Sequence, residues 1–536
     1  MNQFSFITLC ALLAAGAVHA QDAPPPPGAM WLGQFKVDGK ATPIILHDRS
    51  ATQGAPSAID MPMLNARGVP LAKFSMTPVG GRFEVQGGPE LLAFDGKRAK
   101  GRLEGKVMQG NKAGSFTLVQ AHPGSPADNA LYAGSYQIAP GHVIDMGPMD
   151  EAGGLLVFLD QKTLRQGPLY PLSRTSFVGG PTIGAPYPFV IGADFVKDAK
   201  GQVTGLRWRD GKRTLLAKKI APFKTEEVTV SSGDVILKGT LQVPWGAGPH
   251  PAVVFAHGSG DATRAAGFWN TFFTRQGIAV LSLDKRGVGA SGGDWKKASM
   301  QDIANDWLAG VAMLKQRADI DAKRIGVHGS SQGGWTGALM AATSPDVAYL
   351  IARAGSADPV IDTMVYEIGW SVREAGFSEA DAQEAQDGAR SLFALGNASW
   401  AEFSAISTPL KAKPWANHAW VVHMSEAGWG RPWNALNAGF DPAATLARVK
   451  VPVLWFLGDL DHNVDSASTA TRLAAARKAS GNADMTVVRM PNAGHSFLRT
   501  QTGNGGEFAS ASYFAPGYFD VMEKWLKQRG LSQPKH

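Results

Sequence analysis

Residues 323–335 read KRIGVHGSSQGGW: an apolar run, a glycine-rich turn, and the start of a segment rich in alanine and leucine. This order predicts a short strand, a sharp turn and a helix. Residues 329–333 form the pattern Gly-X-Ser-X-Gly. A serine at such a turn is held in a strained backbone with its hydroxyl exposed, and flanking glycines leave room for the tight passage. The stretch therefore predicts a nucleophile, Ser331, beside the positive end of a helix.

Two further polar side chains follow apolar segments downstream of Ser331. Asp461 comes after the apolar segment 453–457, and His495 comes after the segment 485–488. A serine nucleophile needs a base to take its proton and a carboxylate to orient that base. The carboxyl ends of parallel strands meet at one edge of a sheet, where ligands bind. We therefore predict a catalytic triad of Ser331, Asp461 and His495.

Three nearby carboxylates compete for the role of orienting the histidine. Asp459 is closest to the end of the predicted strand, whereas Asp461 has the usual Gly-X-X-Asp spacing from Gly458. Asp465 stands where the N-cap of the next helix is expected. We favour Asp461 over Asp459 on this spacing.

The segment 257–260 reads HGSG and directly follows the apolar segment 252–256. An acyl-transfer site needs two backbone N–H groups that bind the oxyanion of the tetrahedral intermediate. We expect one from Gln332, the residue after the nucleophile, and the other from Ser259. Gly258 allows this backbone to approach the serine closely.

Other histidines receive structural roles. His257 is expected to fix its loop by hydrogen bonding, His462 to lie in a surface loop, and His328 to pack within the strand before Ser331. We expect no metal and no organic cofactor.

Between residues 225 and 536, short apolar segments alternate with helical ones, which predicts a mostly parallel sheet covered by helices on both faces. The alternation stops between residues 357 and 449, a tryptophan-rich segment in which residues 360–403 have helical character. Its place after the sixth strand predicts a helical lid. We expect most of its tryptophans in the lid's own core and one or two facing substrate.

Residues 30–122 and 130–221 have short alternating runs broken by Gly, Pro and Asp, which predicts one or two small antiparallel β domains. Both stretches begin with an aromatic-X-Gly element, at Trp31 and Tyr132, which indicates a weak internal repeat. Neither contains a catalytic set of residues. We expect them to pack over the enzyme or to bind a partner.

The apolar run of residues 4–18 and the small residues after it predict a signal peptide at residues 1–20, followed by a proline-rich linker at 21–29. We therefore expect an exported protein, periplasmic or secreted. The single cysteine, Cys10, lies in the leader, so the mature chain is expected to use no disulfide and no catalytic thiol. No other segment is apolar and long enough to span a membrane.

The net charge is +7, but the basic residues are scattered rather than gathered in a stripe, which argues against a nucleic-acid partner. A length of 536 residues calls for more than one domain. We expect a small-molecule ester or peptide substrate; the sequence carries no signal for the oligomeric state.

Residues 226–530 resemble the serine α/β-hydrolases of the esterase and peptidase group. Four motifs carry the resemblance: HGSG at 257–260, DKRGVGASGG at 284–293, GSSQG at 329–333 and GH at 494–495. The second motif is similar to that of bacterial exported hydrolases related to dienelactone hydrolases, serine aminopeptidases and prolyl oligopeptidases. The resemblance implies the α/β-hydrolase fold and a triad on Ser331. However, dienelactone hydrolases use a cysteine nucleophile, and the amino-terminal part shows no blade repeat of a β-propeller.

Three functions remain open on the sequence alone. Hydrolysis of carboxylic esters through an acyl-enzyme is favoured. A peptidase with the same triad needs a site for a peptide amine, and Glu367 or Glu374 in the lid could supply it. The third is a surface-binding protein with a vestigial hydrolase domain, against which the complete triad argues.

Overall fold

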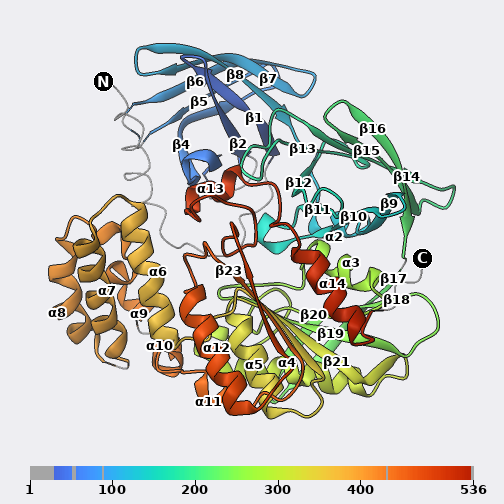
Figure 1. Cartoon of the computed structure of the whole chain (residues 1–536). Coiled ribbons are helices and arrows are strands. Elements are labelled where there is room, and N and C mark those ends of the chain that lie inside the picture. Colours follow the sequence, from blue (N-terminus) through green and yellow to red (C-terminus); the bar gives the residue numbers. More distant parts are fainter. Residues whose placement is uncertain are drawn as a thin grey trace. The chain divides into compact units, whose positions relative to one another are not determined.

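The computed structural model describes residues 29–532, except 51–55, 87, 89, 222, 397 and 430–431. The predicted signal peptide and all but the last residue of the linker thus lie outside the described residues. The chain forms two compact units (Figure 1). The first comprises the residues up to Ile220 with Gly267–Thr271 and Gly505–Tyr513, and the second comprises the rest. Among the described residues, no helix has the length and apolar character needed to cross a membrane.

The first unit contains two closed, antiparallel barrels of eight strands each. In the first barrel the strands pair in chain order and β8 closes onto β1. Its strands are β1 (Ala29–Val37), β2 (Lys40–Asp48), β3 (Ala58–Met61), β4 (Ala66–Met76), β5 (Gly80–Val85), β6 (Leu92–Ala99), β7 (Arg102–Gln109) and β8 (Lys112–Gln120). Stacked and edge-on phenylalanine rings fill the interior, with 4.5 Å between the centroids of Phe83 and Phe94. Eight strands enclose just enough space for such side chains.

The second barrel repeats this order, and β16 closes onto β9. Its strands are β9 (Gly134–Ala139), β10 (His142–Pro148), β11 (Leu156–Asp160), β12 (Gln166–Pro171), β13 (Ser176–Gly179), β14 (Ile191–Lys197), β15 (Val203–Asp210) and β16 (Arg213–Ile220). A short helix, α2 (Pro126–Ala130), precedes it. The predicted antiparallel β-rich region is therefore present, and the shared barrel topology agrees with the weak repeat. Closure removes the sheet edges that would otherwise pair with other chains.

The second unit is built on one eight-stranded sheet in the order β17-β18-β20-β19-β21-β22-β23-β24. These strands are β17 (Phe223–Ser232), β18 (Val235–Pro244), β19 (His250–Ala256), β20 (Ala279–Leu283), β21 (Ile320–Ser330), β22 (Tyr349–Arg353), β23 (Val453–Gly458) and β24 (Met485–Met490). The β17–β18 hairpin is antiparallel, and all pairs from β20 to β24 are parallel. The strand order reverses at β19, so the loops after β19 and β21 meet at the switch point where such sheets bind ligands.

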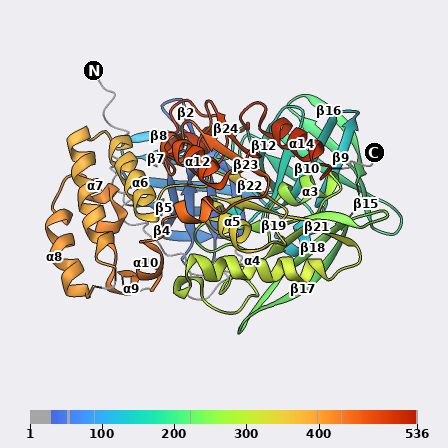
Figure 2. The same ribbon diagram turned by 60° about the horizontal axis from the view of Figure 1, so that its bottom comes forward.

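Helices α4 (Met300–Lys315) and α5 (Gln332–Thr343) pack on one face of this sheet (Figure 2). They share a buried core with the alternate residues Ile325 and Val327 of β21. His328 points away from that core and lies 5.0 Å from the Phe255 ring, centroid to centroid. It is therefore the packed strand residue that the sequence predicts, and burial lowers its pKa to about 3.

In the sequence, the other helices of the described residues stand between the strands of the sheet, after β24, or in the insertion. They are α3 (Phe268–Arg275), α12 (Ser466–Ser480), α13 (Gly505–Ser510) and α14 (Tyr518–Gln528), and in the insertion α6 (Val360–Glu374), α7 (Glu379–Ala394), α8 (Trp400–Lys411), α9 (Glu426–Trp429), α10 (Pro432–Asn437) and α11 (Ala443–Leu446).

The insertion between β22 and β23 is helical, as the sequence predicts (Figure 1). Its own apolar core runs from Val365 to Trp429 and contains most of the tryptophans of this segment. In contrast, Leu446 and Val449 belong to the core of the sheet. The part that folds around its own core therefore ends near residue 429. The predicted boundary at 449 lies beyond it, after α10 and α11.

Candidate active site

Ser331 lies at the turn from β21 to α5, with φ 53° and ψ −116°. A positive φ is a costly conformation for a residue with a Cβ, and it persists only where the surroundings enforce it. A Cβ on Gly329 would lie 2.1 Å from the carbonyl oxygen of Gly333, and a Cβ on Gly333 would lie 2.1 Å from that of Ala256. Glycine is therefore required at both positions, and the strained turn that the motif predicts is present.

Asp461 and His495 meet through the loops after β23 and β24. The His495 Nδ1 atom lies 2.9 and 3.0 Å from the two carboxylate oxygens of Asp461. Because an ionised carboxylate only accepts, Nδ1 carries the proton and Nε2 is left as the basic nitrogen. The Asp461 side chain is fully buried, and its Oδ1 also accepts the N–H groups of Asn463 and Val464. These bonds fix the carboxylate that orients the imidazole.

The electrostatic surroundings of His495 favour its protonated form. Burial lowers its pKa, but the charge and the hydrogen bond of Asp461 raise it, and the net pKa lies above the usual 6.5. Arg353, at the end of β22, acts in the lowering direction, and Glu367 of α6 in the raising direction. An imidazole that takes a proton from a serine hydroxyl is stabilised by this arrangement.

The rival carboxylates have other partners. Asp459 pairs with Arg489 at 2.7 Å. Asp465 is the N-cap of α12 and accepts two backbone N–H groups at 3.0 and 2.9 Å. The geometry thus favours Asp461 as the orienting group, as the spacing from Gly458 predicts.

His462 has a more specific environment than the surface loop expected for it. Its ring stacks on Trp370 of α6 with 3.7 Å between centroids and 10° between the planes. Tyr366 of the same helix donates its hydroxyl to the Asp461 carbonyl at 3.1 Å. The inserted helix α6 therefore packs directly against the loop that carries Asp461.

The loop 257–260 passes beside the predicted nucleophile. A Cβ on Gly258 would lie 3.5 Å from the Ser331 Cβ, in ordinary contact. The His257 Nε2 donates to the Leu283 carbonyl at 2.7 Å, which is the loop-fixing role expected of it. Gln332 begins α5 and is buried. The structure thus brings Gly258 and Gln332 to Ser331, while the use of the Ser259 and Gln332 N–H groups as oxyanion donors stays a prediction.

Two charged residues beside Ser331 were missed by the sequence argument. Arg353 donates to the Ser330 Oγ through Nε and Nη2, at 3.2 and 2.9 Å. Lys285 contacts both the loop 257–260 and Gln332. Lys285 lies inside the conspicuous motif at 284–293, but nothing in the motif says where the ammonium group points.

Within the residues that the structure describes, no group of His, Cys, Asp and Glu side chains is arranged to hold a metal ion. The site is composed of a hydroxyl, an imidazole, carboxylates and backbone N–H groups.

Residues 247–501 match a family model described as serine aminopeptidase, S33. The match covers slightly less than half of the chain and shows that this part is similar in sequence to the α/β-hydrolases. The strand order and the position of the strained serine between β21 and α5 fit that fold. The hydrolase unit, as we call the second unit from here on, is the part of the molecule that carries the site.

Individual relatives are more distant. Esterase EstD of Thermotoga maritima is 31% identical over 155 residues, which cover 27% of this chain and 36% of that protein. An uncharacterized 31.7 kDa protein of Escherichia coli is 28% identical over 120 residues, 22% of this chain and 42% of that protein. The chain thus spans well under two thirds of the length of these curated relatives. Among solved structures, an esterase of Pyrococcus furiosus is 19% identical, with a TM-score of 0.36, and the match covers 57% of this chain and 91% of that one.

Proposed function

We propose that the hydrolase unit cleaves carboxylic esters through an acyl-enzyme, with Ser331 as nucleophile, His495 as base and Asp461 as orienting carboxylate. The observation that carries the proposal is the Asp461–His495 pair, with its carboxylate buried and its Nδ1–oxygen distances of 2.9 and 3.0 Å. The strained Ser331 and the HGSG loop beside it supply the other two parts that acyl transfer requires.

In the proposed reaction the Ser331 Oγ attacks the ester carbonyl carbon while the His495 Nε2 takes the hydroxyl proton. The oxyanion is bound by the N–H groups of Gln332 and Ser259. Collapse of this intermediate breaks the bond to the alcohol, which leaves with the proton from His495. Water then attacks the acyl carbonyl carbon and gives one proton to Nε2. Collapse of this second intermediate breaks the bond to the Ser331 Oγ, which takes the proton back from Nε2, and the acid is released.

We also propose that the helical insertion acts as a lid. Its helix α6 brings Tyr366 to the Asp461 carbonyl and Glu367 into the electrostatic environment of His495. A helix in this place narrows the range of substrates that reach Ser331 and excludes water. Export to the periplasm or beyond remains a proposal from the apolar leader sequence.

A second function, removal of amino-terminal residues from peptides, has one specific observation in its favour. Glu367 is partly buried on α6 near the Asp461–His495 pair, and burial raises its pKa. A carboxylate in that position could bind the protonated α-amine of a peptide. We rank this function second because burial raises the pKa of Glu367 and so disfavours the ionised carboxylate with which an α-amine would pair.

We expect short p-nitrophenyl esters to exceed aminoacyl p-nitroanilides in kcat/KM by more than about tenfold, or ~1.4 kcal/mol of barrier. The ester is the easier bond to cleave, so a triad without dedicated amine recognition shows its activity there first. Parallel kinetics with the two substrate sets measure the ratio, and Glu367→Gln should leave the ester value within about threefold.

Glu374→Gln, at the carboxyl end of α6, is the matched control. If the anilides have the higher kcat/KM and Glu367→Gln removes that activity while Glu374→Gln keeps it, the hydrolase unit is an aminopeptidase.

A further inference from the structure

Lys285 is a buried cation beneath the predicted oxyanion site. Its side chain follows β20, and the residue is only 1% exposed. Its Nζ donates to the carbonyl oxygens of Gly258 and Gly260, at 2.9 and 3.1 Å, and to the Gln332 Oε1 at 2.8 Å. One ammonium group therefore joins the HGSG loop to the residue that follows Ser331.

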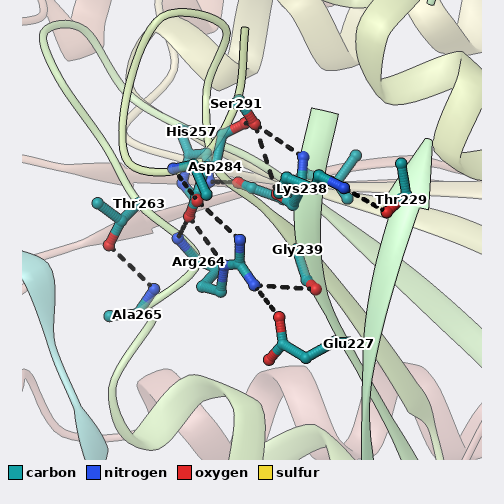
Figure 3. A network of polar contacts seen from close by, with 12 residues as sticks. Glu227, Thr229, Lys238, Gly239, His257, Thr263, Arg264, Ala265, Asp284 and Ser291 are labelled. Carbon is teal, nitrogen blue, oxygen red and sulfur yellow. Dashed lines mark hydrogen bonds and ion pairs between the residues drawn. The ribbon is translucent and has the colours of Figure 1, made fainter. Parts of the chain in front are cut away.

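The backbone that carries Lys285 is held rigidly. The adjacent Asp284 accepts three hydrogen bonds from Arg264, from its backbone N–H, Nε and Nη2 at 2.8, 3.0 and 2.8 Å, and one from the Ala290 N–H at 2.9 Å. Arg264 also contacts Glu227 and the Gly239 carbonyl of the β17–β18 hairpin, and Ser291 bonds to the backbone of Asp284 and Lys238 (Figure 3). This network fixes the start of the Lys285 side chain relative to the sheet.

The contacts of Lys285 fit its charged form. Three acceptors surround Nζ, and only an ammonium group offers three N–H donors. The Trp295 ring lies 4.8 Å from Nζ, and Trp295 is itself held by Asp261, whose carboxylate favours the charge. Burial acts in the other direction and lowers the pKa of Lys285 to about 7.

Burying a charge costs free energy, so a buried cation in this place calls for a reason beyond packing. The acceptors that Lys285 holds belong to the two segments on which the predicted oxyanion donors lie.

We propose that Lys285 is a positioning residue that sets the direction and separation of the two oxyanion donors, the N–H groups of Ser259 and Gln332. The Gly258 carbonyl and the Ser259 N–H belong to one planar trans peptide unit, so they point in opposite directions. When the Lys285 Nζ binds the Gly258 carbonyl oxygen on one side of this peptide unit, the Ser259 N–H is directed to the opposite side. The bond to the Gln332 Oε1 places the start of α5 against the same ammonium group. This inference rests on the proposed function, because it concerns the geometry of the acyl-transfer site.

Lys285→Met keeps an unbranched side chain, shorter by the terminal nitrogen, and removes its donors. We expect kcat on p-nitrophenyl esters to fall about 10²-fold, the loss typical of one oxyanion donor, while KM changes by less than about threefold. The affinity of a trifluoromethyl ketone, whose serine adduct carries the same oxyanion, should fall by a similar factor. A role limited to folding would not lower kcat and analogue affinity together at unchanged KM and unchanged melting temperature.

The control is Lys296→Met, because the Lys296 ammonium lies over the same Trp295 ring, 5.7 Å from its centroid. It should retain wild-type kcat and analogue affinity. If Lys285→Met does not fold, Gln332→Met tests the inference by removing one of the three acceptors, and it should lower kcat several-fold and weaken the analogue in parallel.

The inference is overturned if the folded Lys285→Met variant keeps kcat within about twofold, if its kcat falls while the analogue still binds as in the wild type, or if Gln332→Met changes neither quantity. These outcomes test the role of Lys285 alone, provided that the Ser331→Ala variant has lost the turnover seen in the wild type. If the Ser331→Ala variant turns over the ester as fast as the wild type, that result contradicts the proposed function instead.

Discussion

Asp461→Asn is expected to lower kcat by about four orders of magnitude on p-nitrophenyl esters, because the amide favours the wrong histidine tautomer. The Asp461 carboxylate accepts the Nδ1 proton of His495 at 2.9 Å, which leaves Nε2 free to act as base. An asparagine that turns its NH₂ group to Nδ1 forces the proton onto Nε2. Its oxygen can still accept the N–H groups of Asn463 and Val464, so the loop is expected to keep its conformation.

Asp459→Asn is the matched control for this loss. Asp459 stands two residues earlier in the same loop and pairs with Arg489. Its replacement should change kcat by less than about threefold, since surface ion pairs contribute little. Steady-state kinetics of the two variants decide the assignment: equal losses, or a larger loss in Asp459→Asn, would move the orienting role away from Asp461.

Gly333→Ala is expected to abolish ester hydrolysis and to lower the free energy of unfolding by more than about 3 kcal/mol. The added Cβ would lie 2.1 Å from the Ala256 carbonyl oxygen and 3.2 Å from that of His257. Both are backbone atoms of β19 and the loop after it, so neither can rotate away. Relief of the clash requires α5 to move from β19, which separates Ser331 from the HGSG loop.

Urea unfolding followed by tryptophan fluorescence measures this effect, with Gly439→Ala as the control. A Cβ on Gly439 would meet nothing within 4 Å, and Gly439 does not have a positive φ. That variant should be as stable as the wild type or slightly more stable. If the two variants unfold at the same urea concentration, the structure is contradicted in its claim that close packing excludes a Cβ at position 333.

The residues of the proposed triad could be singled out in the sequence because few positions in an α/β sheet can carry such chemistry. Ser331, Asp461 and His495 each follow a short apolar segment, and such segments become neighbouring strands whose carboxyl ends share one edge. The Gly-X-Ser-X-Gly pattern adds a local steric reason, now visible as the contacts that Gly329 and Gly333 allow.

Other features depend on contacts between residues far apart in the chain. Alternating residues indicate strands, but they do not say that β8 pairs with β1 or β16 with β9, so the two closed barrels were not foreseen. In the same way, Lys285 finds its acceptors at positions 258, 260 and 332, which no local motif connects.

The extent of the helical insertion was overestimated for a related reason. The predicted lid runs to residue 449, but the last helix of the insertion ends at Leu446, and Leu446 and Val449 pack into the core of the sheet. A helical pattern reports which face of a segment is apolar and not which of two cores will bury it. For His462, likewise, the loop position was predictable but the stacked partner Trp370 on α6 was not.

Labelling with a fluorophosphonate, followed by mass spectrometry of the peptide around residues 323–335, tests the central claim most directly. The adjacent Ser330 is the internal control, because its Oγ is held by Arg353 rather than exposed at the turn. We predict that the wild-type chain and Ser330→Ala are labelled at Ser331 and that Ser331→Ala is not labelled. An unlabelled wild type, or labelling that persists in Ser331→Ala, would contradict the assignment of Ser331 as the nucleophile.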